Sequence, residues 1–217
     1  MIPFEIIINW VIIYQKECDT VINNRLKKQL DFIIEIDKVK EIIRMTYIAS
    51  GSRRENDAEH SWHLAIMAFL LSEYVDDDID ITKVMKMVLV HDLVEIYAGD
   101  TFAFDEKGYE DKEERERAAA EKLFGILSED QYKEFKGLWE EFEECNTKEA
   151  KYGAMLDRLQ PLILNYAVGG GSWKEHDISA EQVYKRNEIT LKEGPEEFKE
   201  IINFVVNECL EKGYIKK

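Results

Sequence analysis

Two neighbouring residues, His91 and Asp92, lie in the apolar stretch Val84–Leu93, which we expect to form a helix. Burying a charged carboxylate in such a stretch costs several kcal/mol unless the group is paired or bound to a cation. Consecutive residues of a helix point about 100° apart, so a cation above the groove between the two side chains can contact both. Taken alone, the pair is better explained by a buried histidine that donates a hydrogen bond to a backbone carbonyl.

Two further residues favour a metal site. His60 begins another expected helix, and Asp157 lies inside a third apolar helical stretch. If the three helices converge, they bring together two imidazoles and two carboxylates, those of His60, His91, Asp92 and Asp157. This mixed nitrogen and oxygen set suits one divalent cation, Mn²⁺, Co²⁺, Fe²⁺ or Mg²⁺, with Zn²⁺ as an alternative. Four protein ligands leave an octahedral ion two positions for water and a substrate oxygen, which metal-assisted hydrolysis requires.

The order of these residues resembles the HD superfamily of metal-dependent phosphohydrolases. Three longer strings, Glu55–Ser61, His91–Asp100 and Leu156–Arg158, are similar to its 5′-deoxynucleotidase-like branch. The similarity covers roughly residues 29–190. It implies an all-α fold, commonly assembled as a homodimer, that hydrolyses deoxynucleoside 5′-monophosphates to deoxynucleosides and phosphate.

The resemblance also implies two catalytic residues. Glu95 would position or deprotonate the attacking water, and it shares a helix face with His91 and Asp92 because it follows them by four and three residues. The alternative for Glu95 is a surface acid or a partner of the ligands. Asp100, directly after Gly99 at the expected helix end, would activate the nucleophile or protonate the leaving oxygen. The alternative for Asp100 is an acid that only forms the turn.

Two arginines are candidates for substrate binding. Arg44 matches the family arginine that binds phosphate, and a guanidinium is well suited to that task. Its alternative is a helix-end arginine that compensates the helix dipole. Met45 follows it where a family member has Trp, which puts sugar or base selection in question more than hydrolysis. Arg54 lies in the loop before His60 and is the second candidate, although loop arginines are usually solvated.

Composition excludes several classes of function. The formal net charge of −16 opposes binding to a nucleic-acid polymer or an anionic membrane. The three cysteines form no CxxC motif, which suits a reducing compartment. The apolar start, Ile2–Tyr14, lacks a basic segment and is too short to span a bilayer. We therefore expect a cytoplasmic protein. No histidine lies between Leu93 and Leu156, so a single-ion site is favoured over a two-metal one.

Helical periodicity runs through almost the whole chain, so the expected fold is an all-α HD-domain bundle of about eight to nine helices around a buried metal site. Residues 1–25 are expected to form an N-terminal helical extension, and residues 26–217 the HD domain with its C-terminal helices. The run Gly169–Ser172 should interrupt the helices. The expected helices cover residues 27–47, 58–74, 82–97, 110–126, 129–144, 147–167, 179–192 and 195–212.

We therefore expect an HD-type metal-dependent phosphohydrolase whose substrate is a small phosphomonoester, a deoxynucleoside or nucleoside 5′-monophosphate. Two alternatives remain. One is a non-catalytic, metal-stabilised helical module that binds a nucleotide or docks a partner, favoured by Met45 and by the excess of acids over residues 105–149. The other is a phosphatase for a different small phosphoester.

Overall fold

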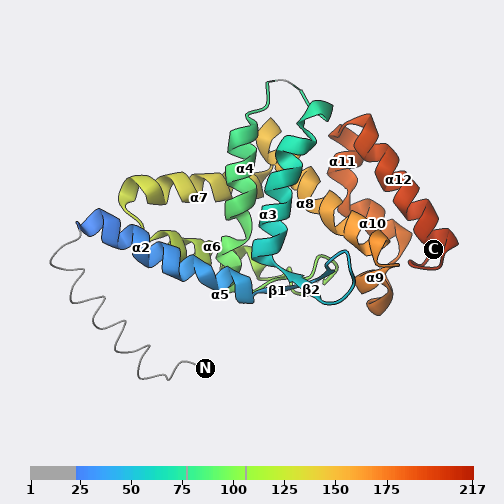
Figure 1. The fold of residues 1–217 in the computed structure, drawn as a ribbon, viewed down its shortest axis with the longest axis horizontal. Coiled ribbons are helices and arrows are strands. Elements are labelled where there is room, and N and C mark those ends of the chain that lie inside the picture. The colour runs from blue at the N-terminus through green and yellow to red at the C-terminus, as the bar shows by residue number, and fades with distance from the viewer. Residues whose placement is uncertain (1–22, 77, 106) are drawn as a thin grey trace.

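The computed structural model describes residues 23–76, 78–105 and 107–217, and these are mostly helical (Figure 1). The expected all-α architecture is confirmed. The predicted N-terminal extension, residues 1–25, lies almost wholly outside the described residues, so the boundary at residues 25 and 26 stays a prediction. Within the described part of the chain, no helix is both long enough and apolar enough to cross a membrane.

Three helices that pack on one another form the centre of the molecule: α3 (Asp57–Leu70), α4 (Ile81–Val90) and α8 (Lys148–Ala167). On one side of them lie α2, α6 and α7, and on the other α9 to α12 (Figure 1). The bounds of the flanking helices are α2 (Asn24–Ile36), α6 (Lys112–Phe124), α7 (Glu129–Glu144), α9 (Gly171–Glu175), α10 (Ala180–Arg186), α11 (Glu188–Glu193) and α12 (Glu196–Glu211). Short 3-10 helices cover Asp37–Glu41, Ser72–Tyr74 and His91–Val94.

The start of α3 is defined by a capping box. The Asn56 side chain accepts a hydrogen bond from the Glu59 backbone, and the Glu59 carboxylate accepts one from the Asn56 backbone. These two bonds satisfy amide groups that the first turn of a helix leaves unpaired. Because Asn56 is the cap, the carboxylate of Asp57 is free to point into the protein, and His60 follows one turn later on the buried face.

Helix α8 packs closely on its neighbours and is altered next to Asp157. A Cβ atom at Gly153 would lie 3.1 Å from the Phe142 ring, so a larger residue here would push the ring away by a few tenths of an ångström. Pro161 lies inside α8, four residues after Asp157. Because proline has no backbone N–H, the carbonyl of Asp157 lacks its usual helical donor. Helix α8 continues through Pro161, but it lacks one backbone hydrogen bond on the turn that carries this acid.

The segment 27–47 was predicted as one helix, and this is wrong for its second half. Helix α2 ends at Ile36, and after the 3-10 turn the chain forms β1 (Ile43–Tyr47), which pairs antiparallel with β2 (Arg54–Asn56). The β-branched residues Ile42 and Ile43 fit a strand as well as a helical stripe, and pairing with β2 decides between them. Arg44 therefore lies on a strand, and its alternative as a dipole-compensating helix end falls away.

Two other predicted helices are divided. The segment 82–97 is helical as α4 only to Val90, continues as the 3-10 helix His91–Val94 and ends as α5 (Glu95–Ala98) before Gly99. His91 and Asp92 thus lie at the end of α4 and not in the middle of a longer helix. The segment 179–192 is split into α10 and α11 at Asn187. The predicted interruption at residues 169–172 occurs at Gly170, and α9 begins directly after it.

The HD pair lies where two hydrophobic clusters meet. The larger cluster includes Val84 and Val88 of α4 together with the buried faces of α3, α8 and α12. The smaller one includes Val90, Leu93 and Val94, together with α6 and the start of α7. The main chain therefore passes from one core into the other at His91 and Asp92, and both cores hold these residues in place.

Removing the cap of α3 should destabilise the fold. We expect Asn56→Ala to lower the free energy of unfolding by about 1 kcal/mol, because the Glu59 amide loses its acceptor and the capping box is broken. Urea unfolding measures this change. The matched control is Asn203→Ala, at an exposed position inside α12, which should cost nothing. Equal stability of Asn56→Ala and the wild type would contradict the assignment of the cap.

Candidate metal centre and active site

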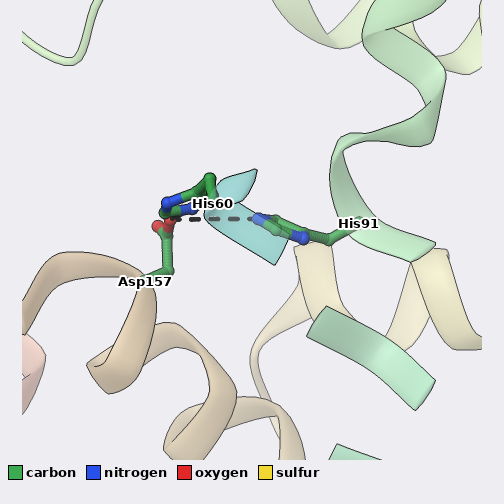
Figure 2. Close-up of side chains that lie close together, drawn as sticks. All are labelled: His60, His91 and Asp157. Carbon is green, nitrogen blue, oxygen red and sulfur yellow. Dashed lines mark hydrogen bonds and ion pairs between the residues drawn. The ribbon is translucent and has the colours of Figure 1, made fainter. Parts of the chain in front are cut away.

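The four residues predicted as metal ligands lie together. His60 from α3, His91 from the 3-10 helix and Asp157 from α8 each offer a ligand atom, and these atoms lie within 4.8 Å of one another. Figure 2 shows the three side chains pointing toward a common centre. Asp92 completes the group, with Oδ1 3.1 Å from His91 Nε2 and Oδ2 3.8 Å from His60 Nε2. The structure thus brings together three elements that are distant in the sequence.

Hydrogen bonds at the far side of each ring fix which nitrogen faces the centre. His91 Nδ1 lies 2.9 Å from the Val88 carbonyl oxygen, and His60 Nδ1 lies 3.2 Å from Gln160 Oε1. Both acceptors need an N–H on Nδ1, so in the neutral rings Nε2 carries the lone pair. His60 Nε2 then faces Asp157 Oδ1 at 3.1 Å, and His91 Nε2 is buried without a hydrogen-bond partner. A lone pair that faces a carboxylate is repelled unless a proton or a metal ion lies between them.

The donor set fits a divalent cation. It combines two imidazole nitrogens with carboxylate oxygens and includes no thiolate, which matches the preferences of Mn²⁺, Co²⁺, Fe²⁺ and Mg²⁺. Adjacent donors on one octahedral ion, each about 2.1 Å from it, lie about 3 Å apart. Two of the donor pairs already stand at 3.1 Å. The orphaned Nε2 of His91 supplies the independent sign that an ion belongs here.

Without a metal, protons fill the same role. Burial opposes a charged His91, but Asp92 and Asp157 outweigh it and raise its pKa to about 10. The pKa of His60 is also raised, because Asp157, Glu55 and Asp92 overcome the opposing effects of burial and Arg44. The pKa of Asp157 lies well below its ordinary value despite burial, because the positive charges of His60, 3.1 Å away, and of His91, 3.9 Å away, stabilise its ionised form. The metal-free centre therefore holds an imidazolium at His91 at neutral pH.

A second acidic group adjoins the first. Asp57, Asp92 and Glu95 each place an oxygen within 4.8 Å of the others, and all three are largely buried. Burial, followed by repulsion from Asp92, raises the pKa of Asp57 to about 7. Burial, Asp92 and Asp57 raise the pKa of Glu95 well above its ordinary value. Three carboxylates this close cannot all ionise, so this group retains a proton near neutral pH.

Arg44 supplies positive charge next to the carboxylates of Asp57 and Asp92. Its Nη1 donates to Asp92 Oδ2 at 2.7 Å and to Asp57 Oδ1 at 3.1 Å, and its side chain is only 13% exposed. Arg44 also lines the cavity described below. The sequence does not single out Asp57, because an acid in the first turn of a helix is common and is explained by the helix dipole.

Arg54, the other predicted substrate ligand, lies elsewhere. Its Nη2 pairs with Glu175 at 2.9 Å, and its guanidinium lies over the Tyr47 ring, 5.4 Å from the centroid. It is not among the residues that line the cavity. The strand β2 directs it toward α9 instead, so the prediction that Arg54 binds substrate finds no support in its position.

A buried chain of polar contacts orients His60. Gln160 Nε2 donates to Glu55 Oε2 at 2.8 Å, while Gln160 Oε1 accepts from His60 Nδ1. His63 Nδ1 lies 3.3 Å from the same Gln160 nitrogen. His63 therefore supports His60 and does not reach the cluster itself. Such contacts fix the tautomer and the ring orientation of a metal-binding histidine.

The predicted catalytic residues line a cavity of about 270 Å³ next to the cluster. The polar residues of its lining include Glu95 and Asp100 together with Arg44, His91 and Asp92. Burial, as the largest cause, raises the pKa of Asp100. The apolar part of the lining comes from Phe102, Phe104, Phe142, Pro161, Leu162 and Trp173.

Two arginines that line this cavity were missed. Arg158 follows Asp157 in α8, and Arg186 comes from α10. Arg186 Nη2 lies 3.1 Å from Asp157 Oδ2, opposite the histidines. The sequence carried one signal for Arg158, a second charged residue inside an apolar stretch. It carried no signal for Arg186, whose position depends on how the C-terminal helices pack.

Comparison with known proteins agrees with this geometry. A family model described as "HD domain" matches residues 36–199. The 5′-deoxynucleotidase HDDC2 of Homo sapiens is 30% identical over 135 residues, which cover 62% of this chain and 65% of the human protein. The protein of the same name from Dictyostelium discoideum is 31% identical over 147 residues, covering 65% of this chain and 77% of that protein. The chain thus spans slightly less than two thirds of the human relative.

Solved structures show the same fold. A crystal structure from Magnetospirillum magnetotacticum MS-1, described as a predicted metal-dependent phosphohydrolase, has a TM-score of 0.82 and 46% sequence identity. The match covers 90% of this chain and all of that one. A conserved hypothetical protein from Pyrococcus furiosus matches with a TM-score of 0.59 and 27% identity, over 82% of this chain and 99% of the other.

Metal binding should stabilise the protein through Asp157. At a free Mn²⁺ concentration one hundred times its dissociation constant, we expect about 2.7 kcal/mol of stabilisation, because the unfolded chain lacks the site. Asp157→Asn should lose most of this effect. Asp130→Asn, an exposed acid paired with Arg25, should retain it. Thermal melting with Mn²⁺ and with a chelator measures the difference. The same Mn²⁺ effect in Asp157→Asn and the wild type would exclude this centre.

Metal affinity should rise with pH. The pKa of about 10 at His91 means that the metal-free protein holds a proton there at pH 7, and metal binding must release it. Each proton released makes the affinity rise about tenfold per pH unit below that pKa. Calorimetric titration with Mn²⁺ at pH 6, 7 and 8, in buffers of different ionisation enthalpy, counts the protons. A pH-independent affinity with no proton release would contradict the assigned protonation.

Proposed function

Because this chain belongs to the HD-domain family, we propose that it is a metal-dependent phosphohydrolase that cleaves a deoxynucleoside or nucleoside 5′-monophosphate to nucleoside and phosphate. The observation that carries this proposal is the convergence of His60, His91, Asp92 and Asp157 beside a cavity that Glu95 and Asp100 also line. The name 5′-deoxynucleotidase, borne by the curated relatives, supports the choice of substrate. A cavity lined by both charged and aromatic residues suits a molecule that joins a phosphate to a base.

We propose His60, His91, Asp92 and Asp157 as the ligands of one divalent ion, Mn²⁺, Co²⁺, Fe²⁺ or Mg²⁺, with Zn²⁺ as an alternative. The ion supplies a Lewis acid that polarises the phosphoryl group and lowers the pKa of a water molecule. The protein's own contribution is to hold the four donors ready. Arg44 takes part by fixing one oxygen of Asp92 at 2.7 Å, which leaves Oδ1 of that carboxylate directed toward His91.

Glu95 is the proposed proton acceptor for the attacking water. Burial and the neighbouring Asp92 and Asp57 raise its pKa, and a base whose pKa approaches the working pH transfers protons most efficiently. Asp57 lies beside Glu95 and can also hold a proton near neutral pH, since its own pKa is about 7. In hydrolysis the water oxygen bonds to phosphorus, the P–O5′ bond breaks and one water proton passes to Glu95.

Asp100 is the proposed proton donor to the leaving O5′ oxygen. Its half-buried carboxyl lines the same cavity, and its raised pKa favours the protonated form that such a donor needs. The residues before it also suit this role. Gly99 has a φ of 79°, so the chain turns sharply after α5 and leads Asp100 along the cavity wall.

Contact between Arg44 and the substrate phosphate remains part of the proposal, because Arg44 lines the cavity. Arg54 is left out of it, since its guanidinium is paired with Glu175. We also propose a homodimer, in keeping with the HD family and with the exposed Ile33 and Ile34 of α2. A cytoplasmic location is supported by Cys145 and Cys209, which are free thiols.

The metal-loaded protein should release phosphate from at least one deoxynucleoside 5′-monophosphate. We expect Glu95→Gln to lower kcat by about 10²–10⁴-fold, because glutamine cannot accept the proton, while Mn²⁺ still stabilises the variant. His91→Ala should abolish both turnover and Mn²⁺ stabilisation. Glu188→Gln, an exposed acid paired with Lys192, is the matched control and should keep full activity.

The assay is phosphate release across a panel of nucleoside monophosphates and other phosphoesters, with each divalent ion in turn. Turnover confined to another phosphoester would keep the reaction and change the substrate. Tight nucleotide binding without phosphate release under any ion would instead favour a non-catalytic binding module. Wild-type rates in His91→Ala would rule out the proposed reaction centre.

A further inference from the structure

Arg158 and Arg186 line the cavity from two different helices, and both lie next to Asp157. Arg186 Nη2 donates to Asp157 Oδ2 at 3.1 Å. Arg158 Nη1 donates to the Ala154 carbonyl of its own helix at 2.7 Å. Among the described residues, no acid lies within ion-pair distance, 4.0 Å, of Arg158. One of the two guanidinium groups therefore lacks a counter-charge.

Without a bound anion, this arrangement of the two arginines is energetically unfavourable. Arg158 is half-buried, and a buried guanidinium without an anionic partner loses hydration that nothing replaces. Burial and the nearby positive charge of Arg186 both lower the pKa of Arg158. Two positive charges held close together at a cavity wall are stabilised when an anion binds between or beside them.

The charges of the neighbouring groups indicate how much negative charge this wall can accept. A divalent ion at the proposed centre would be neutralised by Asp92 and Asp157. Arg44 is already engaged by Asp57 and Asp92. Once Asp157 binds the ion, Arg186 shares with that ion the one acidic partner that it has among the described residues. The two arginines then leave a charge of about +2, which complements a phosphate monoester with a charge of about −1.5 to −2 near pH 7.

We propose that Arg158 and Arg186 form the phosphate-binding subsite of this enzyme. Their guanidinium groups would bind the phosphate oxygens that the metal leaves free, and they would hold inorganic phosphate after the reaction. Arg44, locked by Asp57 and Asp92, would mainly orient the metal ligands. This inference rests on the proposed function. It also makes α10, a C-terminal helix, part of the active site.

The test is calorimetric titration of inorganic phosphate into the Mn²⁺-loaded protein. A hydrogen-bonded charge pair of this kind is worth at least about tenfold in affinity. We therefore expect Arg158→Gln to raise the dissociation constant of phosphate roughly tenfold or more. Arg158→Lys keeps the positive charge but loses the paired N–H donors of the guanidinium. Its dissociation constant for phosphate should lie between those of Arg158→Gln and the wild type. Lys185→Gln removes one exposed positive charge from α10 and should change the affinity less than twofold.

Two further measurements separate a binding role from a structural one. The Mn²⁺ dissociation constant and the melting temperature of Arg158→Gln should match the wild type, because among the described residues the Arg158 guanidinium makes no hydrogen bond or ion pair with a proposed ligand. The inhibition constant of a deoxynucleoside, which has no phosphate, should change less than twofold. Arg186→Gln should also weaken phosphate binding, and its Mn²⁺ affinity is measured in parallel because Arg186 contacts Asp157.

Failure of the subsite and failure of the proposed function give different results. Normal turnover with unchanged phosphate affinity in both Arg158→Gln and Arg186→Gln would overturn the subsite and leave the phosphohydrolase intact. No turnover on any substrate, with phosphate affinity still lost in Arg158→Gln, would overturn the reaction and support the subsite. A wild-type protein that binds no phosphate when loaded with Mn²⁺ would overturn the subsite outright. Variants of Arg158 and Arg186 that lose affinity for Mn²⁺ but not for phosphate would overturn it too.

Discussion

The structure depends on balancing the negative charge of several carboxylates buried where α3, α4 and α8 meet. Asp57, Asp92, Glu95 and Asp157 lie out of water and close to one another, an arrangement that a folded protein maintains only with compensating positive charge. Arg44 compensates on one side. On the other side, protonated histidine or a divalent ion compensates. The raised pKa values of His60 and His91 show how strongly the neighbouring carboxylates favour positive charge there.

The rest of the fold serves this centre. The capping box at Asn56 sets the first turn of α3, and the change from α4 to a 3-10 helix turns His91 and Asp92 into the space between two hydrophobic clusters. Pro161 removes one backbone hydrogen bond of α8 on the turn that carries Asp157. The C-terminal helices complete the arrangement, because Arg186 reaches the outer oxygen of Asp157 from α10. Fixed donors of this kind let a metal bind without large rearrangement of the chain.

The helical architecture can be predicted from local periodicity, and His91, Asp92 and Asp157 stand out as polar residues in apolar helical stretches. His60 lies in a polar string at a helix start, and only the resemblance to the family motif singles it out. It misses β1, because Ile42 and Ile43 continue the helical stripe and only pairing with residues 54–56 turns them into a strand. Asp57 does not stand out, because an acid in the first turn of a helix is common. Arg186 could not be predicted, since its contact with Asp157 is decided by the packing of α12 on α8 and of α10 on α12.

Two groups of side chains could each hold a metal ion, one around His60, His91 and Asp157 and the other formed by Asp57, Asp92 and Glu95. Because we expect the ion only in the first group, its position is a direct test. Anomalous diffraction from crystals grown with Mn²⁺ locates the metal independently of activity. We predict one peak, roughly 2.0–2.3 Å from donor atoms of His60, His91, Asp92 and Asp157. A peak between Asp57 and Glu95 instead, or no peak beside the two histidines, would contradict the assignment.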